Sequence, residues 1–201
     1  MFGRGKIGLV MRVGLLQLVI AFMFHAMPLR AQSLFVLTPA SPQPAQAALA
    51  PGLAVSYAYG EVRWLDVAAG YRSYAKPGKP LKGFMYGDTE VGQKVLTSDS
   101  REEVTAFIKG FMRFEEGVHE LEFQSNDGLR VLMNGIKVYE HDGRHTCQTK
   151  GAIQIKAPKT GWYAVEALYF QRLHTACLDL SMRRPGGEWD WTEPEMYAHL
   201  R

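Results

Sequence analysis

The chain has 201 residues, of which 47% are hydrophobic, with 23 basic and 20 acidic side chains. This length suits one domain with a sizeable core. Residues 1–47 hold four of the basic residues and no acidic one, which leaves 19 basic and 20 acidic residues in the remainder. The basic character therefore belongs largely to the first segment. The remainder carries no electrostatic footprint for nucleic acid, so no nucleic-acid partner is expected.

The N-terminus has the pattern of an export signal. Basic residues precede the apolar run VGLLQLVIAFMF, Val13 to Phe24. Its length of about twelve residues is typical of a signal-peptide h-region and is short for a bilayer span. We predict that residues 1–31 form a signal peptide or N-terminal export segment, with cleavage after Ala31 or after Ala47. The alternative is a retained anchor. The protein is expected to be periplasmic or secreted, touching a membrane only through an uncleaved leader.

Residues 32–51 are predicted to form a linker, because TPASPQPAQAALAPG is rich in proline and alanine. The folded domain is expected over residues 52–201. LAVSYAY and EVRWLDV are predicted to be its first strands. Residues 70–100 are expected to be irregular surface chain, because Pro77, Gly78, Pro80, Gly83 and Gly87 interrupt them.

From Val104 onward, short runs alternate apolar and polar residues at period two. The runs are VTAFIKGFMRF, GVHELEFQS, LRVLM, IKVYE, AIQIKAP, GWYAVEALYFQR and ACLDLSMRR. Asn134-Gly135, between the third and fourth of them, is a strong β-hairpin signal. No stretch between 52 and 185 carries a convincing helical repeat. Strands at a spacing of roughly ten residues predict an all-β, antiparallel sandwich or barrel.

The chain contains two cysteines, Cys147 and Cys177. In an exported protein an isolated pair is expected to form a disulfide. A metal site is a weaker interpretation, because neither cysteine has a C-x-x-C partner.

The order of these motifs resembles the PA14 domain family, a β-sandwich first described in a toxin's protective antigen. The resemblance rests on FIKGFMRFEEGVHELEFQSNDGLRVLMNGIKVYE, on GWYAVEALYFQRLHTACLDLSM and on the opening GLAVSYAYG. Within it, Ser125-Asn126-Asp127-Gly128 matches the family's Ser-Asp-Asp-Gly turn. The resemblance covers most of residues 52–200 and implies an antiparallel two-sheet β-sandwich.

It also implies a non-catalytic binding module, with carbohydrate bound through loops at one end of the sandwich. In the adhesin branch of the family, two consecutive aspartates joined by a cis peptide hold a calcium ion. Here the matching pair is Asn126-Asp127, with one carboxylate and one amide. Calcium prefers several hard oxygen ligands and gains affinity from carboxylate charge. No cofactor is therefore predicted, and calcium remains the alternative.

The candidate ligand-binding residues lie in turns: Asn126, Asp127, Gly128, Asn134, His141, Asp142 and Arg144. Each also has a simpler explanation, because Asn and Asp bond their own backbone in turns and Gly adopts positive φ. HDGRHTC places two histidines four residues apart. That spacing suits a metal only on a helix, and Asp142-Gly143 indicates a loop. No metal site is predicted.

Trp189 and Trp191 are candidates for stacking on a sugar ring, and the alternative is that the C-terminal tail packs over the sandwich. Trp64 and Trp162 lie in strand-like runs and are expected in the core. No G-x-S-x-G, P-loop or H-E-x-x-H motif is present, so no enzyme is predicted. The leading hypothesis is an exported module that binds a carbohydrate or envelope glycan. The rival is a protein-interaction module of the cell envelope with no sugar ligand.

Overall fold

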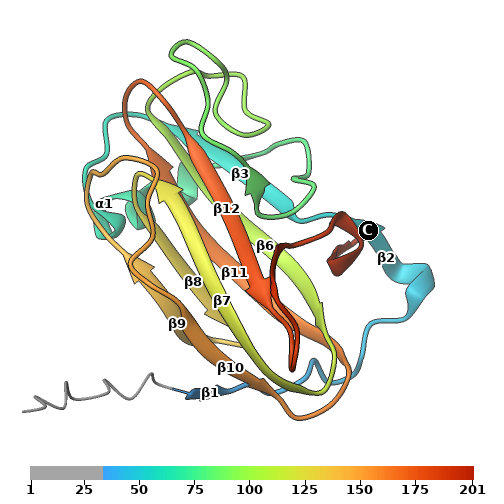
Figure 1. The fold of residues 1–201 in the computed structure, drawn as a ribbon. Helices are drawn as coiled ribbons and strands as arrows, with labels where there is room; N and C mark the ends of the chain where they lie inside the picture. The colour runs from blue at the N-terminus through green and yellow to red at the C-terminus, as the bar shows by residue number, and fades with distance from the viewer. Residues whose placement is uncertain (1–33) are drawn as a thin grey trace, which may run out of the picture. The chain divides into compact units, whose positions relative to one another are not determined.

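The computed structural model describes residues 34–201, which form two packed β-sheets (Figure 1). The predicted export segment, residues 1–31, lies outside the described residues. Every strand pairing is antiparallel except one, the parallel pairing of β1 with β10. The prediction of an all-β, two-sheet antiparallel sandwich is confirmed. Among residues 34–201 no helix is long and apolar enough to cross a bilayer.

The first sheet has β7 and β12 at its centre. In spatial order its strands are β1 (Leu34–Val36), β10 (Ile153–Ala157), β7 (Gly117–Asn126), β12 (Cys177–Arg183) and β13 (Trp189–Trp191), with β5 (Met85–Tyr86) also paired to β12.

The second sheet is built around the long pair β6 and β11. In spatial order its strands are β2 (Leu49–Pro51), β14 (Tyr197–Leu200), β6 (Val104–Phe114), β11 (Gly161–Gln171), β8 (Leu129–Met133) and β9 (Ile136–His141). Strand β3 (Ala54–Tyr59) pairs with β6, and β4 (Lys76–Pro77) pairs with β3. Asn134 and Gly135 form the hairpin turn between β8 and β9, both with positive φ, as predicted.

The core lies between the sheets, where the period-two alternation points its apolar side chains. On β7 the inward residues Leu121 and Phe123 are fully buried, whereas Val118 on the opposite face is 41% exposed. On β11 the inward residues Tyr163 and Tyr169 are also fully buried. The alternation therefore predicted the inner faces of these strands correctly.

The run EVRWLDV does not form the predicted strand, because residues 61–64 are irregular and a helix begins at Leu65. Helix α1 (Leu65–Gly70) follows Trp64, which is the residue that caps it in an extended conformation. Leu65 and Ala68 are both fully buried, and they pack on the outer face of the second sheet against Leu168 and Phe170. Two apolar residues at helical spacing and a sheet surface to cover favour one helical turn here over a strand.

Residues 34–51 belong to the sandwich rather than to a linker. β1 pairs with β10, β2 pairs with β14, and Leu37 packs in the main core at 1% exposure. Residues 46–48 form a 3₁₀ turn between the two strands. This proline-rich segment therefore forms short strands at the edges of the sheets. Proline is tolerated there because an edge strand does not need every backbone N–H for pairing.

Residues 70–100 are mostly irregular, with only the two-residue strands β4 and β5 and a 3₁₀ turn, but contrary to the prediction they are not all surface chain. After the 3₁₀ turn Tyr71–Tyr74, the segment buries Leu81, Phe84 and Val95 almost completely. The Phe84 ring meets the rings of Phe123 and Tyr197 edge-on, with centroids 5.7 Å apart in each case. This segment closes one side of the core.

Candidate functional site

The turn at Asn126 to Gly128 joins β7 to β8 at one end of the sandwich. The Asn126-Asp127 peptide bond is cis. The Asn126 carbonyl accepts a hydrogen bond from the hydroxyl of buried Tyr169, and its side-chain amide donates to Thr175 Oγ1 at 2.8 Å. Gly128 lies against the Phe170 ring, which would be 2.3 Å from an added Cβ. The turn is therefore fixed by β11 and by the loop that follows it.

Asp127 connects two further loops. It is only 5% exposed, and its two carboxylate oxygens accept backbone N–H groups from His145 (3.0 Å) and Arg172 (2.8 Å). Burial raises the pKa of this carboxyl, and the two N–H donors oppose the rise because they stabilise its charged form. Asp127 therefore links the β9–β10 loop to the β11–β12 loop through these two hydrogen bonds.

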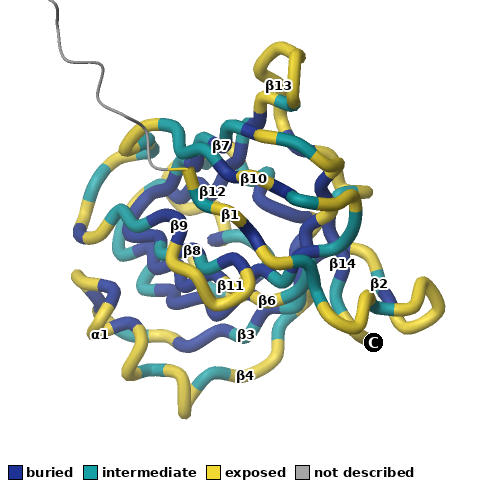
Figure 2. Tube along the Cα trace, turned by 90° about the horizontal axis from the view of Figure 1, so that it is seen from below, coloured by how far each residue is buried: buried dark blue, intermediate teal, exposed yellow. Residues whose placement is uncertain are grey.

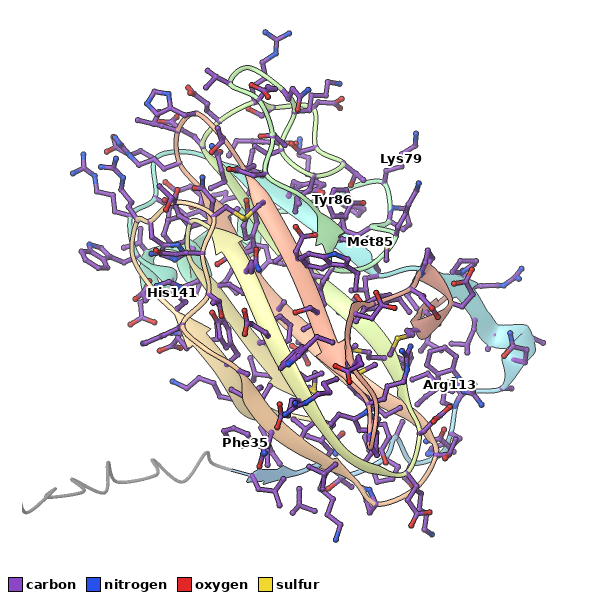
Figure 3. All side chains as sticks on the ribbon, in the orientation of Figure 1. Phe35, Lys79, Met85, Tyr86, Arg113 and His141 are labelled. Carbon is purple, nitrogen blue, oxygen red and sulfur yellow. A yellow bond between two sulfur atoms is a disulfide. The ribbon has the colours of Figure 1, made fainter. Side chains whose placement is uncertain are left out.

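The loop after β9 contains the other acidic candidate. Asp142 Oδ1 accepts the backbone N–H of Leu65, at the start of α1, and that of Gly143, both at 2.7 Å. Figure 3 shows His141 close to α1. The His141 and His145 rings stack with centroids 3.6 Å apart. Desolvation lowers the pKa of His141, and the nearby charges of His145 and Lys150 lower it further.

The predicted disulfide is present. Cys147 in this loop is bonded to Cys177, the first residue of β12, with the Cα atoms 5.8 Å apart. The loop of residues 141–147 is therefore held at three points, by Asp127, by the N-terminus of α1 and by a covalent bond.

Trp64 is exposed rather than in the core as expected. Its side chain is 59% exposed, and its ring would lie 3.1 Å from a Cβ at Gly143, which has φ +85°. Glu61 nearby accepts from Arg63 and Arg172, which lower the pKa of its carboxyl. Trp64 was not predicted as a site residue, because EVRWLDV was expected to be a strand with Trp64 in the core.

The comparisons with known proteins rest on structure. No family model matches the sequence, and neither does any curated protein. Similar structures include the PA14 domain of the MpAFP antifreeze protein, with TM-score 0.64 and 13% identity over 80% of this chain and 96% of that one. A PA14 sugar-binding domain from an RTX adhesin has TM-score 0.59 and 18% identity over 74% and 98%. The Epithelial Adhesin 9 A domain from Candida glabrata, in complex with Galβ1-4GlcNAc, has TM-score 0.61 and 11% identity over 79% and 93%.

The chain has a PA14-like fold. Within it, the candidates Asn126, Asp127, Gly128, His141, Asp142 and Arg144 gather at one end of the sandwich, through the contacts described above. Asn134 does not join them. It lies at the opposite end of β8, about 17 Å away for five strand residues. Its backbone N–H donates to the carbonyl of Ala164 on β11.

A calcium site does not fit the donors of this PA14-like turn. Calcium takes six to eight oxygen ligands, with carboxylates among them. Here Asn126 supplies an amide where the adhesin branch has a carboxylate, and both Asp127 oxygens already accept backbone N–H groups. Among residues 34–201, no group of three His, Cys, Asp or Glu side chains is arranged to hold a metal ion.

The remaining tryptophans lie away from this end. Trp162 on β11 is partly exposed rather than in the core. The C-terminal tail packs on the sandwich, with β13 paired to β12 and β14 paired to β2 and β6. Trp189 and Trp191 on β13 nevertheless remain 39% and 53% exposed. Figure 2 shows β13 on an exposed projection of the first sheet.

Proposed function

We propose that this protein is an exported, non-catalytic module that binds a carbohydrate or envelope glycan at the loop end of its sandwich. The contact surface consists of Trp64, His141, Asp142 and Arg144, and we call it the loop rim. The observation that carries the proposal is the exposed Trp64 ring beside a loop held at three points. Sugar sites combine a flat apolar face with a few directed polar groups on a rigid support.

Within the loop rim, the residues have different roles. Arg144 is exposed and offers several N–H donors to sugar hydroxyls. Asp142 uses Oδ1 for two backbone N–H groups, and its Oδ2 has no hydrogen-bond partner within residues 34–201. The positioning residues are Asn126, Asp127 and Gly128. They lie under the loop rim and hold its loops in place.

Recognition at the loop rim is proposed to be independent of calcium, because the donor set at Asn126-Asp127 is poor for that ion. It is proposed to be non-catalytic for a related reason. Asp127 accepts a backbone N–H group on each carboxylate oxygen and Asp142 accepts two on Oδ1, so both side chains are engaged in holding loop backbone. Both carboxylates instead fix the loops.

Export is supported by the disulfide, since such bonds persist in oxidising compartments. The structure also bears on the predicted cleavage site. Cleavage after Ala47 would remove β1 and the buried Leu37, so we propose cleavage after Ala31. Protein starting at residue 48 is expected to melt at a lower temperature than protein starting at residue 32. Equal melting temperatures would remove this argument.

The test of the loop rim is a glycan array probed with protein of residues 32–201. Trp64→Ala and Arg144→Ala are expected to weaken retention of the bound glycan at least tenfold, with unchanged melting temperatures. Ile136→Ala is the matched control, because Ile136 is 40% exposed at the opposite end of the β8–β9 hairpin. A chelator should leave binding unchanged. If no glycan is retained, or if Trp64→Ala binds as the parent does, the proposal fails.

A protein-interaction module is a second candidate, favoured by an apolar strip on the other edge of the first sheet. Val36, Lys156 and Val118 lie in one cross-strand row, and Leu34 is two residues from Val36. Leu34, Val36 and Val118 are 47%, 56% and 41% exposed. Clustered exposed apolar side chains favour protein contacts, although Lys156 separates Val36 from Val118 in this row. If Val36→Asp abolishes capture of an envelope protein and the array stays blank, this function replaces the first.

A further inference from the structure

The outer face of the first sheet holds a second aromatic surface, away from the loop rim. We propose that the face formed by β7, β12 and β13 is a separate carbohydrate-binding surface, which stacks an uncharged sugar ring against Trp191 and Trp189. We call it the sheet-face site. Its residues are Glu122, Gln124, Ser181, Trp189, Asp190 and Trp191, which line a hollow of about 440 Å³.

The strand register brings Glu122, Ser181 and Trp191 to one face of the sheet. Trp191 pairs with Ser181, and Ser181 pairs with Glu122, so the three form one row across the sheet. On β12 the residues on either side of Ser181 are Leu180 and Met182, and both point into the core. Ser181 is four residues from Cys177, about 13 Å along the strand. The sheet-face site is therefore distinct from the loop rim.

The tryptophan-bearing strand is rigidly attached. Thr192, directly after Trp191, is 4% exposed, and its N–H and hydroxyl both donate to the Leu180 carbonyl at 3.1 Å. The buried Tyr197 hydroxyl donates to Thr192 Oγ1 at 2.6 Å. A ring presented on such a strand loses little freedom when a ligand binds, which favours affinity.

Arg183 fixes the second ring and limits what can bind. Its guanidinium lies 5.6 Å from the centroid of the Trp189 ring and pairs with Glu120. A protein cation therefore already covers one face of this ring, in the position that a ligand cation would take. This arrangement favours an uncharged ligand over a basic peptide.

Three polar side chains of the hollow are free to bind, whereas Asp190 Oδ1 already accepts the backbone N–H of Trp191. The side chains of Glu122, Gln124 and Ser181 have no hydrogen-bond or ion-pair partner anywhere in residues 34–201. A carboxylate accepts, while an amide and a hydroxyl both donate and accept. Such a set matches the mixed donor and acceptor pattern of sugar hydroxyls. Beside two exposed indoles it forms the combination of flat apolar area and convergent polar groups that ring-shaped polar ligands require.

The proposal is tested by native affinity electrophoresis of residues 32–201 in gels containing hydroxyethyl cellulose, laminarin, galactomannan or xyloglucan, which are neutral polysaccharides. At least one of them is expected to retard the parent protein. Trp191→Ala should raise the Kd at least tenfold, and Gln124→Ala several-fold. Trp64→Ala changes the loop rim and should leave this retardation unchanged. Failure of the loop-rim proposal can therefore be distinguished from failure of the sheet-face site.

Three results would overturn the sheet-face site. The first is that none of the polysaccharides retards the parent protein. The second is that Trp191→Ala is retarded as the parent is. The third is that the parent binds pentalysine rather than the sugars, and that this binding requires Trp191. Trp191 is 53% exposed, so its loss should not unfold the protein. If its melting temperature does fall, Gln124→Ala decides the question, and parent-like retardation of that variant then also counts against the site.

Discussion

Replacing Cys147 and Cys177 by alanine removes the only covalent crosslink that the chain can form. The two cysteines are 30 residues apart in sequence. In the chain-entropy model, a closed loop of this length restricts the unfolded chain by about 3.6 kcal/mol at 25 °C. Cys177 is fully buried, so alanine there also leaves a small cavity, and the expected total loss is about 4 kcal/mol.

The assay is urea unfolding of parent and double variant, followed by tryptophan fluorescence. With a slope of about 3 kcal/mol per molar urea, the midpoint should fall by more than about 1 M. Amide hydrogen exchange should accelerate most at residues 141–150, which the crosslink anchors, and least in β6 and β11 at the centre of the second sheet. Equal midpoints, or faster exchange spread evenly over the chain, would refute the reasoning.

Three other substitutions test the interior around the site. Asp127→Ala removes the acceptor of two backbone N–H groups and should lower the free energy of unfolding by about 2–4 kcal/mol in the same urea assay. Gly128→Ala forces a Cβ to within 2.3 Å of the buried Phe170 ring and should cost about 1–3 kcal/mol, visible as a lower Tm. Burial raises the pKa of Asp179 from 3.8 to about 6, so the folded state binds this proton more tightly than the unfolded state does. This residue's contribution to stability therefore falls as pH rises from about 4 to 6, by up to about 3 kcal/mol, and Asp179→Asn should remove that fall from a Tm-against-pH curve.

The parts of the fold that the sequence predicted are those set by local pattern. The alternation of Leu121 and Phe123 with polar neighbours requires only a half-buried strand. Asn134-Gly135 adopts positive φ wherever the chain turns, and the two cysteines had only each other as partners. These features needed no knowledge of distant segments.

The remainder depends on contacts between residues far apart in sequence. Helix α1 has six residues, too few for a helical period to stand out, and it exists because Leu65 and Ala68 cover the second sheet. β1 has three residues and is held by β10, more than a hundred residues later. Trp64 is exposed because it lies directly before the helix, so a prediction that missed the helix also missed this exposure.

The candidate site divides in the same way. The turn residues were found because Asn, Asp and Gly have recognisable preferences. That Asp127 accepts N–H groups from His145 and Arg172 was not predictable, because those residues are 18 and 45 positions away. The face shared by Trp191, Ser181 and Glu122 likewise requires the strand register.

The most direct test of the loop rim is backbone amide chemical-shift mapping of residues 32–201 during titration with the glycan that the array retains. Saturable shifts are expected at residues 141–145 and at the Trp64 indole N–H, with none along β1. Shifts confined to β1 and β10, or an array that retains no glycan, would contradict carbohydrate binding by the loop rim.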